Sequence, residues 1–465
     1  MKCQMSKISR DVKAGMWYTV GNFVNRGIAF ISTPIFSRLL SKEDYGQFSN
    51  FTAWASLLCV ITSLDLFTSI SRAYYDYEDD FDTYMSTISW LSIVFSGVCY
   101  LVVLCLGDVA ESMFGMSFRE INMLFLYLIF SPAIQFFMIQ QRVQGKYKAV
   151  IFVNIGSTLF SLGMSVAAVL TFQDKVWGRI VGYVLPVVIV NLVIYGLFFS
   201  KGRKFIRERA KYALAISIPM IPHSLSGGVL DNSDRLVIKQ YCGNTELAVY
   251  SFAYNCATAV SILNTSINQA NAPWLYRKLK ENDAETIKTH GKELLLFFLA
   301  IILGGMLLTP ELVSILGGKK YADSITLIPI ILLGYCFQFL YTYYVHLEIY
   351  CKKTITISMA TLCAAGINLV LNFICVPRFG YWSAAVTTLV SYIILWLAHY
   401  IITRRMPYKD VYDHKGMMCM MIAFSVCSVG IEYLYGHRQL RYCAILLYAV
   451  LVCGVVYKYI PRKKH

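Results

Sequence analysis

The sequence has few charged residues for its length. Asp, Glu, Lys and Arg make up 15% of its 465 residues, whereas about a quarter of the residues in soluble domains are charged. Hydrophobic residues make up 57% of the chain, and the mean hydropathy is +0.55. This composition excludes an ordinary soluble domain and indicates a chain that lies largely within a membrane.

The sequence also lacks the motifs of common catalytic and metal sites. It contains no GxSxG, P-loop or HExxH stretch and no paired carboxylates on a polar loop, and its 14 cysteines form no CxxC pair or Cys/His cluster. Hydrolytic, nucleotide-driven and metal-dependent functions therefore have no support, and we expect no enzymatic activity, no cofactor and no metal site. Any transport would use ion gradients, the membrane potential or downhill flux of the substrate.

Long apolar runs extend from one end of the chain to the other. Each can cross a hydrocarbon layer of about 30 Å as a helix. We therefore expect an all-α polytopic membrane protein with about 14 transmembrane helices, and no cleavable signal peptide, because the first run is too long and lacks a cleavage site. The runs cover residues 15–38, 45–68, 85–106, 120–140, 149–172, 176–199, 212–233, 246–272, 293–316, 324–347, 354–376, 380–402, 416–434 and 441–460.

Basic residues predict the orientation. With the N-terminus inside, 29 of the 42 Lys and Arg residues fall in inner segments, 12 in outer segments and Arg26 within the first run. The positive-inside rule then places both termini in the cytoplasm. The inner cations are spread over eight short segments rather than one patch, so no nucleic-acid partner is expected. The basic linker 200–213 would meet anionic membrane lipids or simply be a positive-inside loop.

Short motifs indicate an internal duplication. Aromatic-Gly-x-aromatic-Ser stretches occur at Tyr45–Ser49 and Phe379–Ser383, and related stretches at Trp177 and Ala248 give a common offset of 202 residues (248 − 46 and 380 − 178). Two parallel six-helix repeats with a site at their interface are a transporter layout. The predicted domains are an N-lobe at 1–199 with spans 1–6, a cytoplasmic linker at 200–213, a C-lobe at 214–403 with spans 7–12, and spans 13–14 with a basic tail at 404–465.

An arginine lies in the middle of the first run. Arg26 is about twelve residues from either end, or roughly 18 Å from each surface at the helical rise. A central arginine costs at least about 2.5–3.5 kcal/mol on insertion scales, so its side chain should face protein or water. Asn22 lies on the same helical face. Arg26 either lines a substrate cavity or pairs with a carboxylate on a neighbouring helix.

The seventh span is expected to be broken. Pro219 and Pro222 each remove a backbone donor, and Gly227 and Gly228 follow in the same span. Irregular backbone at membrane depth is tolerated where it is buried or lines water, so these four residues form a candidate gate. His223 lies at the break, where it either lines the cavity and exchanges a proton or packs as a hydrogen-bonded histidine.

Two further sets of polar residues follow the seventh-span prolines and glycines in the sequence. Asp234 and Arg235 are expected to form a local ion pair at the outer end of the seventh span. Asn264 and Asn268 occur four residues apart on the eighth span. Hydrogen bonds between helices explain these asparagines as well as sugar contacts in a cavity do.

Several stretches resemble a known family. The N-terminal "GMWYTVGNFVNRGIAFISTPIFSRLLSKEDYGQFS" and the later "SIPMIPHSLSGGVLDNSDRLVIKQYCGNTELAVYSFAYN" are similar to segments of the polysaccharide repeat-unit flippases of O-antigen and capsule type. "LDLFTSISRAYYDYEDD" and "VPRFGYWSAAVTTLVSY" resemble two further segments of these flippases. The resemblance covers spans 1–12 in order. These flippases belong to the multidrug/oligosaccharidyl-lipid/polysaccharide exporter superfamily.

The resemblance implies two six-helix lobes that work by alternating access. Such a protein moves undecaprenyl-diphosphate-linked oligosaccharide from the inner to the outer leaflet of the bacterial plasma membrane, with a polysaccharide polymerase and assembly machinery as further partners. On this analogy Arg26 would bind the diphosphate and His223 would line the cavity. Family flippases favour a cationic cavity, whereas Arg26 is the one strong intramembrane cation recognised in this sequence.

Two other functions compete with the flippase interpretation. A cation-coupled drug exporter of the same fold would need a membrane-embedded acid to carry its ion, and none lies near the middle of a predicted span. An integral-membrane polymerase or glycosyltransferase would need a large extramembrane loop for its chemistry. No outer loop in this sequence is long enough.

Overall fold

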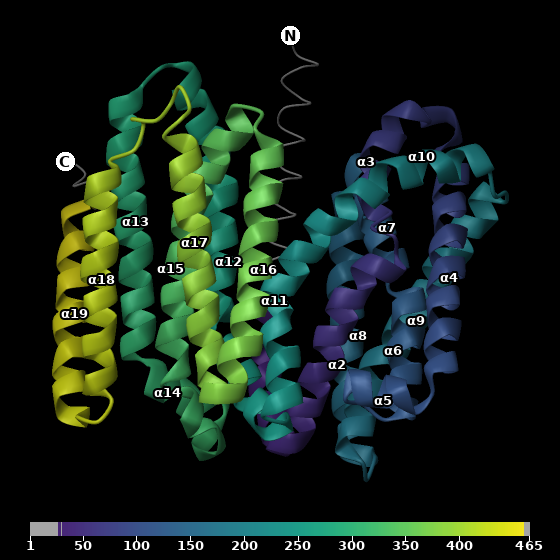
Figure 1. The fold of residues 1–465 in the computed structure, drawn as a ribbon, viewed down its shortest axis with the longest axis horizontal. Helices are drawn as coiled ribbons and strands as arrows, with labels where there is room; N and C mark the ends of the chain where they lie inside the picture. Colours follow the sequence, from purple (N-terminus) through teal and green to yellow (C-terminus); the bar gives the residue numbers. More distant parts are fainter. Residues whose placement is uncertain (1–26, 29, 460–465) are drawn as a thin grey trace, which may run out of the picture. The chain divides into compact units, whose positions relative to one another are not determined.

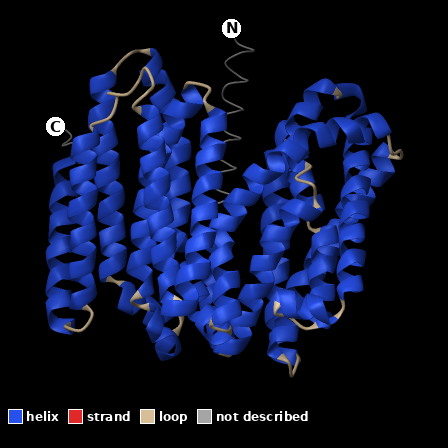
Figure 2. Ribbon diagram, in the orientation of Figure 1, coloured by secondary structure: helices blue, strands red, loops and turns tan. Residues whose placement is uncertain are grey.

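The computed structural model describes residues 27, 28 and 30–459, and their regular elements are helices (Figure 2). No strand occurs in this part of the chain. The predicted all-α fold is therefore confirmed. Helix starts follow local sequence signals: Ser41 and Asp44 form a reciprocal capping box at the first turn of α2, and Ser117 and Glu120 form another at α6.

The long apolar helices follow the predicted spans. Within the described ranges, eleven helical segments are long and apolar enough to cross a membrane, and they coincide with predicted spans 2–7 and 9–13. Two further long helices, α12 (Asn244–Lys280) and α19 (Arg438–Tyr459), occupy the eighth and fourteenth positions. The Asn, Ser and Thr side chains of α12 lower its hydropathy. Of the first predicted span, residues 27, 28 and 30–38 are described and are helical.

The chain divides by contacts into two compact units. The first consists of the residues up to Ser251 together with Thr361–Ala384, and the second of Phe252–Ala360 together with the residues from Ala385 onward. These units do not test the predicted lobe boundaries, which stay a prediction. The first unit contains α2 (Lys42–Thr62), α3 (Phe67–Asp76), η1 (Glu78–Asp80), α4 (Phe81–Leu106), α5 (Asp108–Phe114), α6 (Phe118–Phe130), α7 (Pro132–Val143), α8 (Tyr147–Thr171), α9 (Lys175–Gly202), α10 (Arg207–Ser217), η2 (Ile218–Met220) and α11 (Ile221–Tyr241).

Two apolar clusters form the core of the first unit. One gathers Phe51, Leu124 and Ile180 from α2, α6 and α9. The other gathers Tyr84 and Phe136, with neighbours from α3 and α9. Because both clusters take residues from α9, this helix is the central element of the unit, and α8 packs along it (Figure 1).

The second unit is held by aromatic stacking. It contains most of α12, then α13 (Ala284–Leu307), α14 (Thr309–Leu316), η3 (Gly318–Ser324), α15 (Leu327–Tyr350), α17 (Trp382–Thr403), α18 (His414–Leu434) and α19, while α16 (Thr354–Phe379) is shared between the units. Phe298 stacks on Phe339 with ring centroids 4.0 Å apart, which joins α13 to α15. Helices α18 and α19 lie beside α13 (Figure 1).

Large apolar side chains also lie exposed along the long helices. This arrangement suits lipid as the solvent, since a membrane helix need not hide apolar side chains. On α4, for example, successive turns expose residues that a soluble protein would bury. Among them are Val94, Val98, Leu101 and Val102, each at least half exposed.

Candidate functional site

The first unit contains a half-open cavity of about 340 Å³. Its volume lies within the range of about 300–1,000 Å³ that is usual for ligand pockets. Ten of its fifteen lining residues are polar, and none of the fifteen is acidic. They come from the first helix, α6, α7, α8 and α9, and comprise Ile28, Ser32, Tyr127, Ser131, Ile134, Gln135, Ser157, Thr158, Ser161, Leu162, Arg179, Tyr183, Val187, Val190 and Asn191.

Arg179 is the cation of this cavity. Its guanidinium carbon lies 3.7 Å from the ring centroid of Phe36 and 4.1 Å from that of Phe48. The Nε atom is buried and has no hydrogen-bond partner among the described residues, and no salt bridge to Arg179 occurs within them. An arginine held on aromatic faces keeps its charge available. Cation–π contacts use the face of the guanidinium and leave the N–H donors, which lie in the guanidinium plane, free.

The start of α9 positions Arg179. Asp174 caps the helix by accepting a 3.0 Å hydrogen bond from the Trp177 backbone N–H, and it pairs with Arg119. Burial acts to raise the pKa of Asp174, but these two partners outweigh it and hold the pKa below its usual value. The cap fixes the first turn of α9. Arg179, the fifth residue of the helix, lies just after this turn.

The remaining lining suits a sugar or a phosphate. Tyr127 and Tyr183 stack with ring centroids 5.4 Å apart, and their hydroxyl oxygens are 3.5 Å apart. Ser157 and Thr158 each donate to the backbone oxygen of Asn154. A cation, hydroxyls and aromatic faces can together bind an anionic group with attached sugars, whereas a cationic ligand would meet no counter-charge in this lining.

Two predicted site residues lie outside the described residues. Arg26 and Asn22 belong to the undescribed N-terminal segment, so their cavity roles stay predictions. The described part of the first helix does reach the site, since Ile28 and Ser32 line the cavity.

The seventh span stays helical at the prolines but contains a 3-10 turn there. The 3-10 turn η2 separates α10 from α11; Pro219 lies within this turn and Pro222 in the first turn of α11. Gly227 and Gly228 continue as regular helix inside α11 and do not interrupt it. Their predicted role in a gate is not tested by this geometry.

His223 lies just after this turn but does not line the 340 Å³ cavity. Its Nδ1 atom is buried and has no hydrogen-bond partner among the described residues. The neighbouring Ser224 donates a 2.8 Å hydrogen bond to Asp65. Asp65 is fully buried at the junction of α2 and α3, within electrostatic reach of His223. The two candidate positions, Arg179 and His223, therefore belong to separate polar environments of the same unit.

The two other predicted sets have defined partners. Asp234 is buried and accepts hydrogen bonds from the Tyr250 hydroxyl and from the backbone N–H of Arg235, whose side chain donates to Asn232. The expected local ion pair between Asp234 and Arg235 stays a prediction.

Asn264 and Asn268 join helices of the second unit. Asn268 donates to Asn264, which donates a 3.2 Å hydrogen bond to Gln338 on α15, and Gln338 donates to Tyr392 on α17. Thr342 on α15 donates to Asn268 at 2.8 Å. Hydrogen bonding between helices is thus present at both asparagines. A sugar-binding role for them is not tested.

Sequence reasoning missed Arg179. It is the fifth residue of α9, and the charge count assigned it to an outer segment along with the other outer cations. The available signal was its position within the predicted run 176–199. No group of three or more His, Cys, Asp or Glu residues that could hold a metal occurs in the described part of the chain.

Comparison with known proteins agrees with the sequence resemblance. The profile of a family described as polysaccharide biosynthesis protein matches residues 12–279, more than half of the chain. The chain belongs to this family. Among relatives, a protein of the Lsg locus of Haemophilus influenzae is 27% identical over 352 residues, which cover 70% of this chain and 84% of that protein.

Solved structures of transporters share the fold of this family member. The lipid II flippase MurJ in an inward closed conformation matches with a TM-score of 0.69 at 14% identity, over 95% of this chain and 99% of that one. An inward-facing multidrug resistance MATE family transporter of the MOP superfamily matches with a TM-score of 0.60 at 13% identity, over 86% and 95%. The predicted family and the predicted all-α fold are confirmed.

Proposed function

We propose that this polysaccharide biosynthesis family member is a flippase for lipid-linked oligosaccharide. It moves undecaprenyl-diphosphate-linked repeat units from the inner to the outer leaflet by alternating access of two lobes, without covalent chemistry. The observation that carries the proposal is the cavity around Arg179, whose described lining residues include no acid, in a chain of this family. The membrane is the bacterial plasma membrane, with both termini in the cytoplasm, as the basic residues predict.

Charge complementarity connects the cavity to this substrate. Each phosphate of a diphosphate presents pairs of oxygen acceptors. The guanidinium offers donors in a planar fork that can bind two of these oxygens at once. In a site with low water content, such charge-assisted hydrogen bonds are stronger than at a surface. A lining hydroxyl that already donates to a backbone oxygen, such as that of Ser157, can then accept from a hydroxyl of the first sugar. A drug exporter for cations would instead need an acid in this lining.

Binding of defined lipids tests the substrate class. The full-length protein in nanodiscs is titrated with a polyprenyl-diphosphate disaccharide, with the matching polyprenyl-monophosphate disaccharide and with a lipophilic cation, and affinity is read by native mass spectrometry. The proposal predicts the order diphosphate, then monophosphate, then cation. Preferred binding of the cation would overturn it and favour the drug exporter.

A further inference from the structure

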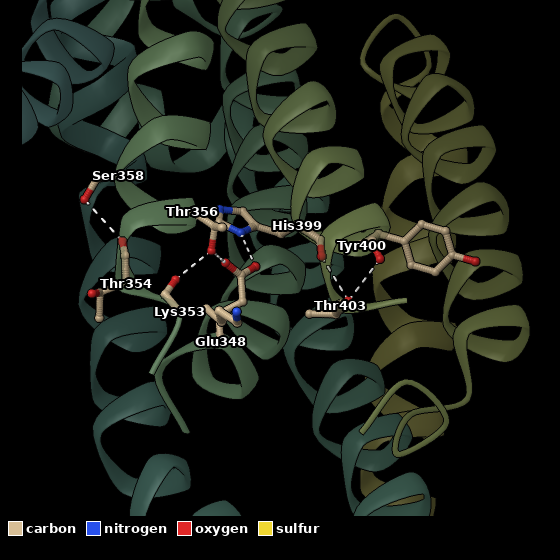
Figure 3. Close-up of polar contacts among 8 residues, drawn as sticks. All are labelled: Glu348, Lys353, Thr354, Thr356, Ser358, His399, Tyr400 and Thr403. Atoms are coloured by element: carbon tan, nitrogen blue, oxygen red, sulfur yellow. Dashed lines mark hydrogen bonds and ion pairs between the residues drawn. The ribbon is translucent and has the colours of Figure 1, made fainter. Parts of the chain in front are cut away.

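A buried acid–base pair lies in the second unit, away from the cavity described above. Glu348 on α15 and His399 on α17 are both fully buried, and His399 Nδ1 is 2.6 Å from Glu348 Oε1 (Figure 3). Buried charges are costly unless they are paired and hydrogen-bonded, so a fully buried carboxylate calls for a physical explanation. The direct contact leaves no room for a metal ion between the two groups.

The hydrogen bonds around the pair define where a proton can bind. Thr356 on α16 has one hydroxyl hydrogen, and its oxygen lies 2.8 Å from Glu348 Oε2 and 2.6 Å from the backbone oxygen of Lys353. Oε1 therefore accepts from His399, while the single Thr356 hydrogen is shared between Oε2 and the Lys353 backbone oxygen. On the other side of the ring, His399 Nε2 is buried and has no hydrogen-bond partner among the described residues.

This geometry points to a one-proton site. We propose that Glu348 and His399 form a proton-binding site of this protein, with Nε2 of His399 as the atom that takes up and releases the proton. When Nδ1–H donates to an ionised Glu348, Nε2 carries a free lone pair and the pair has a net charge of −1. Binding of one proton at Nε2 gives an imidazolium and a carboxylate with no net charge, which a low-dielectric interior favours.

The other titratable groups around the pair do not supply a second counter-charge in contact with it. On α15, the Tyr341 ring stacks on His399 with centroids 5.6 Å apart, and Tyr344 bonds to His414 of α18. On the turn between α15 and α16, Cys351 and Lys353 lie within electrostatic reach of each other, and Cys351 within reach of Glu348. These groups change the pH at which the Glu348–His399 pair binds its proton, but the pair still binds one proton.

The position of the pair connects proton binding to helix packing. Glu348 lies in the last turn of α15, Thr356 in the first turn of α16 and His399 in the last two turns of α17, so the pair joins three helix ends. These ends lie on the predicted cytoplasmic side, a short distance from water. Loss of the proton leaves a buried net charge that is relieved when water reaches this junction, so proton release and opening of the junction favour each other.

The test observes the proton directly in the full-length protein. The imidazole nitrogens of the seven histidines are labelled with nitrogen-15, and their signals are followed in nanodiscs from about pH 4 to pH 9, the range that brackets an unperturbed histidine. The His399→Gln variant assigns the His399 signals, and exposed His437 serves as the internal reference. We expect Nδ1 of His399 to stay protonated while Nε2 gains one proton in a single step.

Two variants should move this step in opposite directions. Glu348→Gln removes the negative partner of the imidazolium and shifts the step to lower pH. Thr356→Val removes a donor that stabilises the carboxylate, which raises the proton affinity of the pair and shifts the step to higher pH. An Nε2 signal that stays in one state over the whole range would overturn the proposal, as would a step that neither variant moves. Because the wild-type titration uses no substrate, its result is independent of the proposed flippase function.

Discussion

At the residue scale, the positive charge of the cavity comes from Arg179, an arginine that the pattern of charged residues in the sequence does not single out. Arg26 attracts notice because apolar residues surround it in the sequence, whereas Arg179 is only the fourth residue of the predicted run 176–199 and lies close to the charged Asp174 and Lys175. The difference arises in three dimensions. The capped start of α9 directs Arg179 inward onto Phe36 and Phe48, residues from distant parts of the chain that no local pattern connects to it.

Replacing Arg179 should weaken binding of the diphosphate lipid. Hydrogen bonds to charged groups contribute about 1.5–3 kcal/mol, so Arg179→Ala should raise the Kd by roughly 10- to 100-fold. Arg179→Lys should restore only part of the affinity, because lysine keeps the charge but lacks the planar fork. The measurement is the nanodisc titration with polyprenyl-diphosphate disaccharide.

Arg72→Ala is the matched control for this prediction. The Arg72 side chain is 73% exposed on α3 and pairs with Asp76, so its loss should leave the Kd unchanged. Unchanged affinity in Arg179→Ala would remove the cavity from the account of substrate binding.

A second residue-scale prediction concerns the loop that precedes α18. Asp413 pairs with Lys292, which holds the pKa of Asp413 below its usual value, and its side chain also accepts from the Gly416 backbone N–H. A depressed carboxyl pKa stabilises the folded protein above the unfolded pKa of about 3.9, and this contribution is lost as the pH falls through the folded pKa. Asp413→Asn should therefore lower the melting temperature at neutral pH but not below about pH 3.

The control for this pH dependence is Asp410→Asn in the same loop. Asp410 is 71% exposed and pairs with Arg404, so its effect on melting should be small, since exposed ion pairs contribute little. The same loss of stability in Asp413→Asn at neutral and acid pH would show that the cap, not the charge, explains the role of Asp413.

At the element scale, the two kinds of helix breaker in the seventh span behave differently. Pro219 and Pro222 interrupt the α-helical hydrogen bonding, because proline has no N–H donor and its ring clashes with the preceding turn. This effect is local enough to predict from sequence. Gly227 and Gly228 only permit other conformations, so their outcome depends on the neighbours. Here α2 packs along α11, and both glycines remain helical.

The spacing of the predicted repeats shows a similar limit of prediction from short sequence motifs. Helix α12 begins 202 residues after α2 (Asn244 and Lys42), whereas α16 and α17 begin 207 residues after α8 and α9 (Thr354 and Tyr147; Trp382 and Lys175). The extra residues fall between α14 and α15, where η3 has no counterpart after α5. Short sequence motifs located the first offset but could not register an insertion in an irregular segment.

Close packing of α8 on α9 gives an element-scale prediction. A Cβ at Gly182 would lie 2.4 Å from the Ser165 Cα, a backbone atom that cannot move aside alone. Gly182→Ala should therefore push the two helices apart and cost about 1–3 kcal/mol, as overpacking does. The measurement is thermal unfolding of the purified protein in one detergent.

Gly196 on the same helix provides the control. A Cβ there would meet nothing within 4 Å, so Gly196→Ala should be neutral or stabilising by about 0.5–1 kcal/mol through helix propensity. Equal melting temperatures for the two variants would contradict a tight α8–α9 contact.

At the scale of the whole molecule, hydropathy predicts most of the architecture. Every predicted span from the second to the fourteenth corresponds to a helix or a helix pair, because a lipid environment leaves few alternatives to a helix. The site was less predictable. Neither the contact of Arg179 with two aromatic rings nor that of Glu348 with His399 has a local sequence signature, since both depend on helices meeting across a unit.

The predicted orientation can be tested with inserted epitopes. A tag placed after Lys204, in the basic linker, should be shielded in intact spheroplasts, whereas a tag after Lys319, in η3, should be accessible to antibody. Permeabilised cells give the reference signal for each insertion. Accessibility of the Lys204 tag before permeabilisation would reverse the orientation and the proposed direction of transport.

Leaflet translocation tests the central claim most directly. Purified protein is reconstituted into liposomes whose outer leaflet carries a fluorescent polyprenyl-diphosphate disaccharide, and a membrane-impermeant reductant reports how much of the lipid has crossed. The account predicts protein-dependent crossing of the diphosphate lipid that Arg179→Ala slows and Arg72→Ala does not. Crossing at the same rate with and without protein, or equal crossing in both variants and the wild type, would contradict it.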